Sequence, residues 1–452
     1  MGKHIDEEVN HDGKGPNRIT TCKHCGGKMS SQAKERWRMH MRQCVSAPDD
    51  VRNAYPTLKR RTFHSSHDGT NATDSHAVSP HVPFKKQTAP PITQPRPTPS
   101  VALPPQLAHK RPSHTPTAPS TSTTTTTSLH SGLSHPAMRA WTEPTLHASQ
   151  LIYPLFITGR PDDNPIRGLE PNVQWGNRDK YASLVAHLEG LVAKGLSSVM
   201  LFGVVDNKDA SGCMADDPST PVIEVMAALR AALPSLLLSC DVCMCEYTDH
   251  GHCGLLKPSP HGGEDIIDNA ATVSRLGAIA LAYARAGAHM VCPSDMMDNR
   301  IGVIRATLNA HGFAHVSIMA YTSKKASCMY APFRDAVEST FKGDRQRYQH
   351  PVGSLSHALL AYDRDVAEGA DTVIVKPSLF YTDIVRALSD KKLVPVACYV
   401  VSGEYKMLKD YGDSTGSMDA VVREAHLSLV RAGANILITY FTPFILNRVA
   451  GW

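Results

Sequence analysis

The sequence predicts an α/β fold, specifically a (β/α)8 barrel over residues 128–452. Amphipathic patterns such as 180–195, 271–287 and 421–433 separate many of the strand-like segments, and several end in Ala-Gly or Lys-Gly, which signals a helix C-terminus. Strands that alternate with helices in this way form a parallel sheet, and eight such units close a barrel. Eight apolar runs supply the predicted strands: LIYPLFI (151–157), SSVMLFG (197–203), LLLSCDV (236–242), HMVCPSD (289–295), VSIMAYT (316–322), DTVIVKP (371–377), VPVACYVVS (394–402) and NILITYF (435–441).

An open, doubly wound sheet is the alternative arrangement for these elements. No glycine-rich phosphate turn follows an early strand, so nothing in the sequence favours it.

Composition restricts the class of protein. Hydrophobic residues make up 42% of the 452 residues and charged residues 20%, as in globular domains, and a net charge of +5 does not by itself indicate nucleic acid or a membrane surface. No apolar run approaches the ~20 residues that span a bilayer. The polar N-terminus carries early acids and lacks an apolar targeting core. We therefore expect a cytosolic protein, with the nucleus as an alternative and a plastid disfavoured.

Composition also divides the chain into three predicted regions: a zinc finger in 1–50, a disordered linker rich in Pro, Ser and Thr in 51–127, and the barrel in 128–452. The finger pattern is Cys22-x2-Cys25-x14-His40-x3-Cys44, a zinc-finger spacing that resembles a BED-type module. Its basic helix could face DNA. Alternatives are a module that binds protein or only stabilises itself, and a fusion introduced by the gene model.

Polar residues gather at or just past the C-terminal ends of the predicted strands. In a parallel barrel these ends meet on the face that carries the chemistry. The sequence therefore predicts an active site built from Cys243, Ser294, Asp295, Lys324, Lys376, Ser402 and Tyr440.

The segment CDVCMCEYTDHGHCG, residues 240–254, predicts a metal site. Cys243, Cys245 and Cys253 offer three thiolates on one loop, a soft ligand set suited to zinc, and a site with three protein ligands keeps an open position as catalytic sites do. The alternative is a structural site completed by Cys240, His250 or His252. Strand alternation turns Cys240 away from Cys243, which favours the catalytic interpretation.

Lys324 and Lys376 are candidate nucleophiles. A lysine attacks a carbonyl only as the neutral amine, which requires its pKa to fall from about 10.4 through burial or a neighbouring cation. We expect a shared barrel mouth and a nearby zinc ion to lower both pKa values. The alternative is that each side chain extends to solvent. Alternation points Lys325 away from Lys324, so Lys325 is expected to be solvated.

Taken together, these segments resemble the porphobilinogen synthase (5-aminolevulinate dehydratase) family over essentially all of 128–452. The resemblance rests on LHSGLSHPAMRAW, LIYPLFIT, CDVCMCEYTDHGHCG, CPSDMMDNR, SKKASCMYAPFRDA, GDRQRYQ, GADTVIVKPSLFY, YVVSGEY and ITYFTP.

The resemblance implies a role for each matching residue. Lys376 would form a Schiff base with the first 5-aminolevulinate, on the propionate side of the product, and Lys324 would bind the second as an imine. The three cysteines would be the Zn²⁺ ligands of the zinc-dependent branch. The substrate-binding residues would be Arg334 and Arg345 for one carboxylate, Ser402 and Tyr440 for the other, and Asp241, Ser294, Asp295 and Gln349 in the pocket.

The implied reaction condenses two 5-aminolevulinate molecules to porphobilinogen with loss of two waters, in a homo-octamer whose arm, about 128–145, embraces a neighbour. The chain departs from the family pattern at Asn299, Lys325, Met329, Ala331 and Arg347, and Arg347 leaves one zinc expected in the barrel. A nucleic-acid-binding zinc-finger protein with a scaffold barrel is the alternative function. The lysines, thiolates and arginines favour the enzyme.

Overall fold

The computed structural model describes residues 130–341 and 343–452, together with three short strands near the N-terminus. The chain divides into two compact units, residues 1–117 and 118–452. In the first, β1 (Val9–Asp12), β2 (Ile19–Cys22) and β3 (Lys28–Ser30) form an antiparallel sheet. Of the predicted finger ligands only Cys22 is described. Cys25, His40, Cys44 and the predicted linker, 51–127, lie outside the described residues, and their structures remain predictions.

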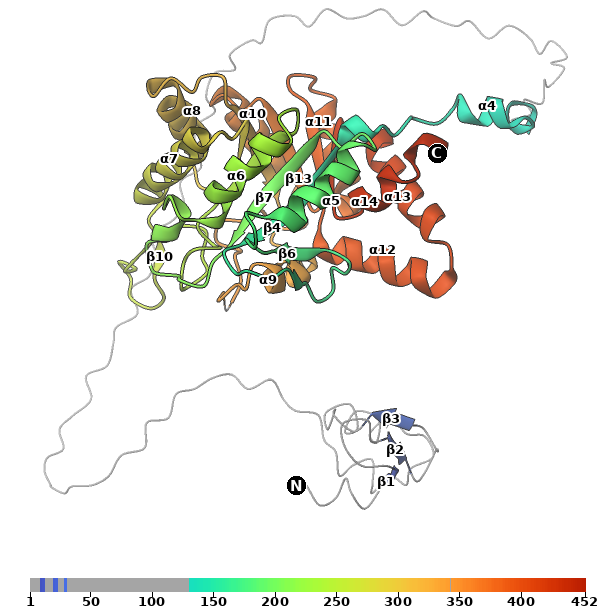
Figure 1. The fold of residues 1–452 in the computed structure, drawn as a ribbon, viewed down its shortest axis with the longest axis horizontal. Coiled ribbons are helices and arrows are strands. Elements are labelled where there is room, and N and C mark those ends of the chain that lie inside the picture. The colour runs from blue at the N-terminus through green and yellow to red at the C-terminus, as the bar shows by residue number, and fades with distance from the viewer. Residues whose placement is uncertain (1–8, 13–18, 23–27, 31–129, 342) are drawn as a thin grey trace, which may run out of the picture. The chain divides into compact units, whose positions relative to one another are not determined.

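Eight parallel strands close a barrel in the second unit, which confirms the predicted fold class (Figure 1). The final strand pairs with the first through Leu437 and Leu151, so no open sheet edge remains between them and the doubly wound alternative is wrong. Each predicted run supplies one strand: β4 (Leu151–Thr158), β7 (Ser198–Val204), β8 (Leu237–Val242), β11 (Met290–Pro293), β12 (Ser317–Lys324), β13 (Thr372–Lys376), β14 (Val396–Val400) and β15 (Ile436–Thr439).

Helices cover the outside of the barrel, and shorter strands extend its rim. β5 (Asn164–Pro165) and β6 (Val173–Trp175) join the edge of β4, and β9 (Leu256–Lys257) pairs with β10 (Ile266–Ile267) in a hairpin. The helices are α5 (Ala182–Val192), α6 (Pro221–Ala232), α7 (Asn269–Ala286), α8 (Arg300–Ala310), α9 (Ala331–Ala336), α10 (Ser356–Ala367), α11 (Thr382–Ser389), α12 (Ser402–Thr415), α13 (Met418–Ala432) and α14 (Thr442–Leu446).

Local chemistry explains where these helices begin and end. Asp268 caps α7 by accepting a hydrogen bond from the Ala271 amide, and Gly287 ends it with φ of 102°. Gly433 ends α13 with φ of 113°, where a Cβ would come within 2.3 Å of the Ser389 hydroxyl. The helices predicted over 180–195, 271–287 and 421–433 are thus α5, α7 and α13.

Aromatic side chains fill the barrel interior toward the C-terminal ends of its strands. The rings of Phe156 and Phe202 lie 5.6 Å apart, and Phe156 stacks on Tyr440 at 6.1 Å. Every residue of β4, β7, β13 and β14 is buried, because the barrel interior packs against one side of each strand and the helices against the other.

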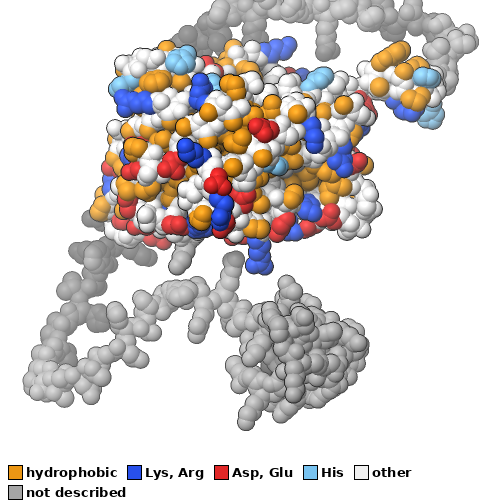
Figure 2. Space-filling model, in the orientation of Figure 1, with side chains coloured by type: hydrophobic (Ala, Val, Ile, Leu, Met, Phe, Trp, Pro, Cys, Tyr) orange, Lys and Arg blue, Asp and Glu red, His pale blue; other side chains and the backbone are white. Residues whose placement is uncertain are grey.

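The segment before the barrel stands away from it (Figure 1). It contains α4 (Pro136–Ala140), and Trp141 at the end of this helix is 80% exposed. An ion pair of 2.5 Å between Glu143 and Arg423 joins the segment to α13. On the face shown in Figure 2, basic and acidic side chains intermingle. Among the described residues, no helix has the length and apolar character needed to cross a membrane.

Arg300, at the start of α8, is a fully buried cation that ties three elements together. Its guanidinium lies 3.6 Å from the carboxylate of Asp295 and 3.4 Å from that of Asp365 on α10. It also donates to the carbonyl oxygen of Tyr321 on β12 at 3.0 Å. Because these charges are withdrawn from water, each depends on the others for stabilisation.

We predict that Arg300→Met lowers the free energy of unfolding by about 3–5 kcal/mol, because it leaves buried carboxylates without their cation. The measurement is denaturant unfolding. Arg386→Met is the matched control, since Arg386 forms an exposed ion pair with Asp390 and should cost less than about 1 kcal/mol. Equal losses in the two variants would contradict the role given to Arg300.

Candidate active site

The two candidate nucleophiles lie side by side at the ends of neighbouring strands. Lys324 ends β12 and Lys376 ends β13, and the two residues are direct partners in the parallel ladder. Both are buried, with exposures of 5% and 4%, so neither extends to solvent. The Lys376 ammonium lies 4.2 Å from the ring centre of Tyr399 and 4.9 Å from that of Phe333. Aromatic rings therefore surround the amine where water would otherwise solvate it.

Burial, followed by the positive charge of Lys324, lowers the pKa of Lys376 to about 7. This agrees with the prediction for Lys376. The prediction for Lys324, which included a zinc ion beside the amine, stays a prediction. Burial disfavours the charged form of Lys324, but negative charge on the cysteine loop, at Cys253 above all, raises the pKa of Lys324. The Lys324 ammonium also donates to the carbonyl oxygen of Ser294.

The loop after β8 brings the three predicted metal ligands together. Cys243, Cys245 and Cys253 are buried, and their Sγ atoms all lie within 4.8 Å of one another. The Sγ atoms of Cys243 and Cys245 are 3.3 Å apart. Hydrogen bonds from the other two thiols hold the pKa of Cys253 well below its usual range. Three converging soft donors, one already favoured as the thiolate, fit a zinc ion.

The residues proposed to complete a structural zinc site make other contacts. The Cys240 thiol points to the sulfur of Met226 on α6, at 3.7 Å, as strand alternation predicted. His250 Nδ1 accepts a hydrogen bond from the His252 amide at 3.0 Å. The Nδ1 atom of His252 lies 3.2 Å from the hydroxyl of Tyr348. These contacts favour the three-ligand arrangement over a closed one.

A second group beside the cysteines contains a residue that the sequence analysis did not single out. One ligand atom each of Asp241, Cys243 and Glu246 lies within 4.8 Å of the others. Glu246 is 2% exposed, and its Oε1 atom has no hydrogen-bond partner. Burial, followed by the negative charge of Asp241, raises the pKa of Glu246 to about 8. Its position directly after Cys245 in CMCEYT was the available signal.

Asp241 and Ser294 join this group to the lysines. The Ser294 hydroxyl donates to Asp241 Oδ2 at 2.8 Å, and Asp241 Oδ1 has no partner. Asp295, also predicted for the pocket, instead accepts from the Met297 amide at 2.7 Å and lies beside Arg300. Through these contacts Asp295 stabilises the fold around Arg300.

A small cavity lies beside the two lysines and reaches the cysteine loop at Cys245. Of the residues that line it, four carry cationic side chains, Lys324, Lys376, Arg334 and Arg345, and Glu246 is the single acid. Cys245 and Ser294 add a thiol and a hydroxyl, and aromatic residues close the remaining wall. The cationic lining therefore favours negative charge beside the two lysines.

The described residues of 326–341 and 343–354, which we call the flap, cover the cavity. Arg334 lies on α9 within the flap, and Arg345 follows it; their guanidinium groups lie 5.6 and 4.7 Å from the ring centre of Phe341. Arg345 also donates to the Gly251 carbonyl oxygen at 2.8 Å, beside the cysteine loop. The side-chain amide nitrogen of the buried Gln349, Nε2, has no hydrogen-bond partner.

Ser402 and Tyr440, predicted to bind a carboxylate, lie at the same barrel face but outside the residues that line the cavity. The Ser402 hydroxyl accepts from the amide of Phe333, in the flap, at 3.0 Å. The hydroxyls of Tyr440 and Tyr399 are 3.1 Å apart. The availability of the Ser402 hydroxyl to a ligand therefore depends on the position of Phe333.

The prediction that Lys325 is solvated is wrong, because its side chain is buried. Its ammonium donates to the carbonyl oxygen of Ser354 and lies 5.7 Å from the ring centre of Tyr381. Its carbonyl oxygen accepts from the hydroxyl of Tyr330 at 2.8 Å, and its amide donates to Lys376 at 2.9 Å. Alternation does point Lys325 away from Lys324, but the end of the flap covers that side. Lys325 thereby fastens both ends of the flap to the lysine-bearing strands.

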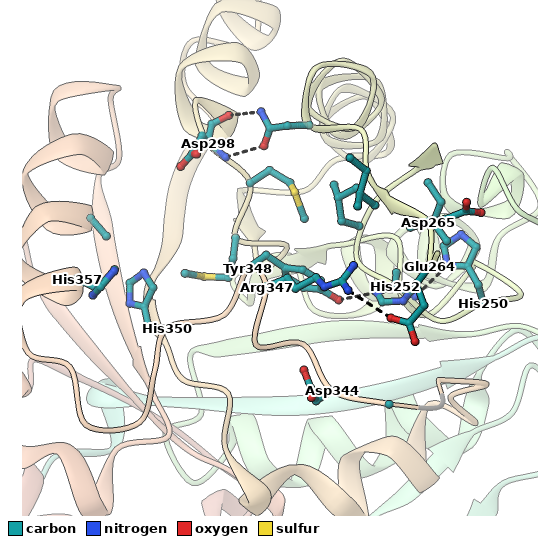
Figure 3. A pocket seen from close by; sticks show the side chains of 18 of the residues that line it. His250, His252, Glu264, Asp265, Asp298, Asp344, Arg347, Tyr348, His350 and His357 are labelled. Atoms are coloured by element: carbon teal, nitrogen blue, oxygen red, sulfur yellow. Dashed lines mark hydrogen bonds and ion pairs between the residues drawn. The ribbon is translucent and has the colours of Figure 1, made fainter. Parts of the chain in front are cut away.

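A larger cavity of about 1160 Å³ lies between the flap, the hairpin β9–β10, the loop 296–298 and helix α10 (Figure 3). Its walls carry both charges: Arg347 forms an ion pair with Glu264 at 3.4 Å, and His350 and His357 face the space from the opposite side. His252 and Tyr348 both line this cavity, and His252 directly precedes Cys253, so the cavity borders the cysteine loop.

Comparisons with known proteins agree on one family. The family model described as delta-aminolevulinic acid dehydratase matches residues 126–448. The delta-aminolevulinic acid dehydratase of Pongo abelii is 48% identical over 330 residues, covering 71% of this chain and 97% of that protein. The Dictyostelium discoideum protein of the same name is 44% identical over 328 residues, with coverages of 71% and 96%.

A solved structure supports the same likeness. The chain is similar to delta-aminolevulinic acid dehydratase from Toxoplasma gondii in complex with the reaction product porphobilinogen. The TM-score is 0.67 at 34% identity, and the match covers 71% of this chain and 91% of that one.

We predict that Lys325→Met loosens the flap, because the Ser354 carbonyl oxygen loses its charged donor. Amide hydrogen exchange should become faster in residues 326–330 and 350–354, by up to about 10- to 100-fold if a buried charge-assisted hydrogen bond is lost. Lys409→Met, which removes an exposed ion pair with Asp413, is the control. Unchanged exchange at both ends of the flap would show that Lys325 does not hold it.

Proposed function

This chain belongs to the delta-aminolevulinic acid dehydratase family and acts as a porphobilinogen synthase, and from that premise we propose how its residues work. Lys376 and Lys324 each bind one 5-aminolevulinate as an imine, and Cys243, Cys245 and Cys253 hold a Zn²⁺ ion beside them. The observation that carries this proposal is the pairing of two buried lysines at neighbouring strand ends, next to three converging thiols.

Lys376 is the better nucleophile of the two. With a pKa of about 7, a large share of its amine is neutral near pH 7, so it attacks the ketone of the first substrate and forms the imine with loss of water. Lys324, 5.6 Å from the ring centre of Tyr321, binds the second substrate. Zinc held by the thiolates supplies a Lewis acid and positive charge beside that substrate.

The carboxylates of the substrates need cationic or hydroxyl partners. Arg334 and Arg345 line the cavity with the lysines, and planar guanidinium groups bind carboxylates in a bidentate manner. Ser402 and Tyr440 provide hydroxyls for the other carboxylate. Asp241, Ser294 and Gln349 complete the pocket, and Asp295 supports it through Arg300.

The overall reaction balances with these groups. Two ketones are attacked by amines, one C–C bond and one C–N bond form between the substrates, two waters leave, and both lysines are released as free amines. A buried cavity favours this chemistry because bulk water, which would hydrolyse the imines, is kept away.

The assembly, the compartment and the N-terminal extension are part of the same proposal. The arm that precedes the barrel, with its exposed Trp141, supports a homo-octamer in which it contacts a neighbour. Residues 1–50 form a BED-like finger that holds a second zinc through Cys22, Cys25, His40 and Cys44, and nucleic acid is its candidate partner. Residues 51–127 form a linker to the barrel domain, 128–452, and the enzyme acts in the cytosol.

The direct test is a colorimetric assay for porphobilinogen from 5-aminolevulinate. We expect product from the zinc-loaded enzyme, at least tenfold less after removal of zinc by a chelator, and recovery when zinc is restored. Lys376→Met should abolish activity, whereas the surface variant Lys409→Met should not. A folded, zinc-loaded protein that makes no product would refute the proposal.

The lowered pKa of Lys376 predicts a pH profile. Below pH 7 the amine is mostly protonated, so borohydride trapping of 5-aminolevulinate on Lys376 should rise about tenfold per pH unit and then level off above pH 7. Mass spectrometry of the labelled peptide measures it. A rise that continues to pH 10 would indicate an ordinary lysine instead.

A further inference from the structure

Glu404 is a fully buried carboxylate near the start of α12, two residues after Ser402. Removing a carboxylate from water is costly unless other groups stabilise its charge. The hydrogen bonds that Glu404 accepts from the described residues come from backbone amides: Val401 at 2.9 Å, Leu379 at 2.8 Å, and Ser378 at 3.1 and 3.4 Å. These amides belong to two segments that are distant in the sequence.

Capping of α12 explains only one of these contacts. A glutamate at the third position of a helix commonly accepts from the amide of the residue that precedes the helix, as Glu404 does from Val401. The same carboxylate also accepts from Ser378 and Leu379, in the turn that follows β13. A cap needs no such contacts and need not be buried, since the side chain of Asp268, which caps α7, is 29% exposed. Glu404 therefore also joins the start of α12 to the turn after β13.

Each of the two joined segments carries one residue that is proposed to bind the first substrate. Lys376 ends β13, and Ser402 begins α12. Their functional groups lie near one another, because both contact Phe333. The amide of Phe333 donates to the Ser402 hydroxyl at 3.0 Å, and its ring centre lies 4.9 Å from the Lys376 ammonium. The position of the amine relative to the hydroxyl is thus set by backbone segments that the Glu404 carboxylate holds together.

The first substrate must reach both groups at once, since only two methylene groups separate its ketone from its carboxylate. A small shift between the segments would let it reach the lysine or the hydroxyl but not both. On the basis of the proposed function, we propose that Glu404 is a positioning residue, which holds Lys376 and Ser402 so that one keto acid binds to both. Glu404 itself does not line the small cavity. Its effect should therefore depend on the carboxylate of the ligand and on the Ser402 hydroxyl.

The test compares two ketones on the full-length, zinc-loaded enzyme: 4-oxopentanoate, and 2-pentanone, in which a methyl group replaces the carboxylate. Each is trapped on Lys376 with borohydride at increasing concentration, and mass spectrometry of the labelled peptide gives the half-saturating concentration. The variants are Ser402→Ala, Glu404→Gln and the two combined. Asp268→Asn is the matched control, because it makes the same change from acid to amide at another helix cap.

We expect Ser402→Ala and Glu404→Gln each to raise the half-saturating concentration of 4-oxopentanoate roughly 10- to 100-fold, as for loss of a hydrogen bond to a charged group. Neither should change that of 2-pentanone. In the double variant the further increase should be less than about threefold, because a hydroxyl that is already displaced has little left to lose. Asp268→Asn should change neither ligand. If circular dichroism shows that Glu404→Gln does not fold, Glu404→Asp, whose carboxylate is shorter by one methylene group, replaces it with the same expectations.

Three outcomes would overturn the role given to Glu404. An equal rise for both ketones would mean that Glu404 supports Lys376 or the fold in general. Additive losses in the double variant would mean that Glu404 and Ser402 act independently, and no change in Glu404→Gln would mean that the two segments keep their positions without it. A wild-type enzyme in which neither ketone labels Lys376 would instead refute the imine chemistry of the proposed function, and the role of Glu404 with it.

Discussion

The parallel register between β12 and β13 is the constraint on which the site depends. It places Lys324 directly opposite Lys376, so two amines share one water-poor space. In that space two like charges repel strongly, and one of them gives up its proton more easily. Negative charge on the cysteine loop, at Cys253 above all, favours the protonated form of Lys324, so Lys376 loses its proton more readily. Strand pairing thus makes Lys376 the more reactive of the two amines.

The flap depends on the same two strands. Lys325 contacts both of its ends, while Lys208 holds its middle by donating to the carbonyl oxygens of Val337 and Glu338 at 3.1 and 2.9 Å. Arg160 also binds Glu338 with two hydrogen bonds of 2.6 and 2.7 Å. The flap that carries Arg334 and Arg345 is therefore fixed to the rim at several points, so the arginines can be positioned without help from a ligand.

Charge complementarity links the site to its ligand. Cations line the small cavity, and the acids Asp241 and Glu246 gather on the side of the cysteine loop. A bifunctional substrate would be oriented by this separation before any bond forms, which lowers the entropic part of the barrier. The buried Arg300 cluster performs a different task, since it stabilises the barrel behind the site.

The sequence by itself determined the elements of the barrel, the three-thiol group, the outward direction of Cys240 and the strand-end positions of Lys324 and Lys376, because hydrophobic periodicity and ligand spacing are local properties. Only the tertiary structure decided that Lys325 is buried, since alternation tells which side of a strand a residue faces but not that Ser354, distant in the chain, covers that side. It also decided the opposite pKa shifts of the two lysines and the isolation of Glu246. These depend on distances between charges from different strands and on the removal of water from between them, which no local pattern records.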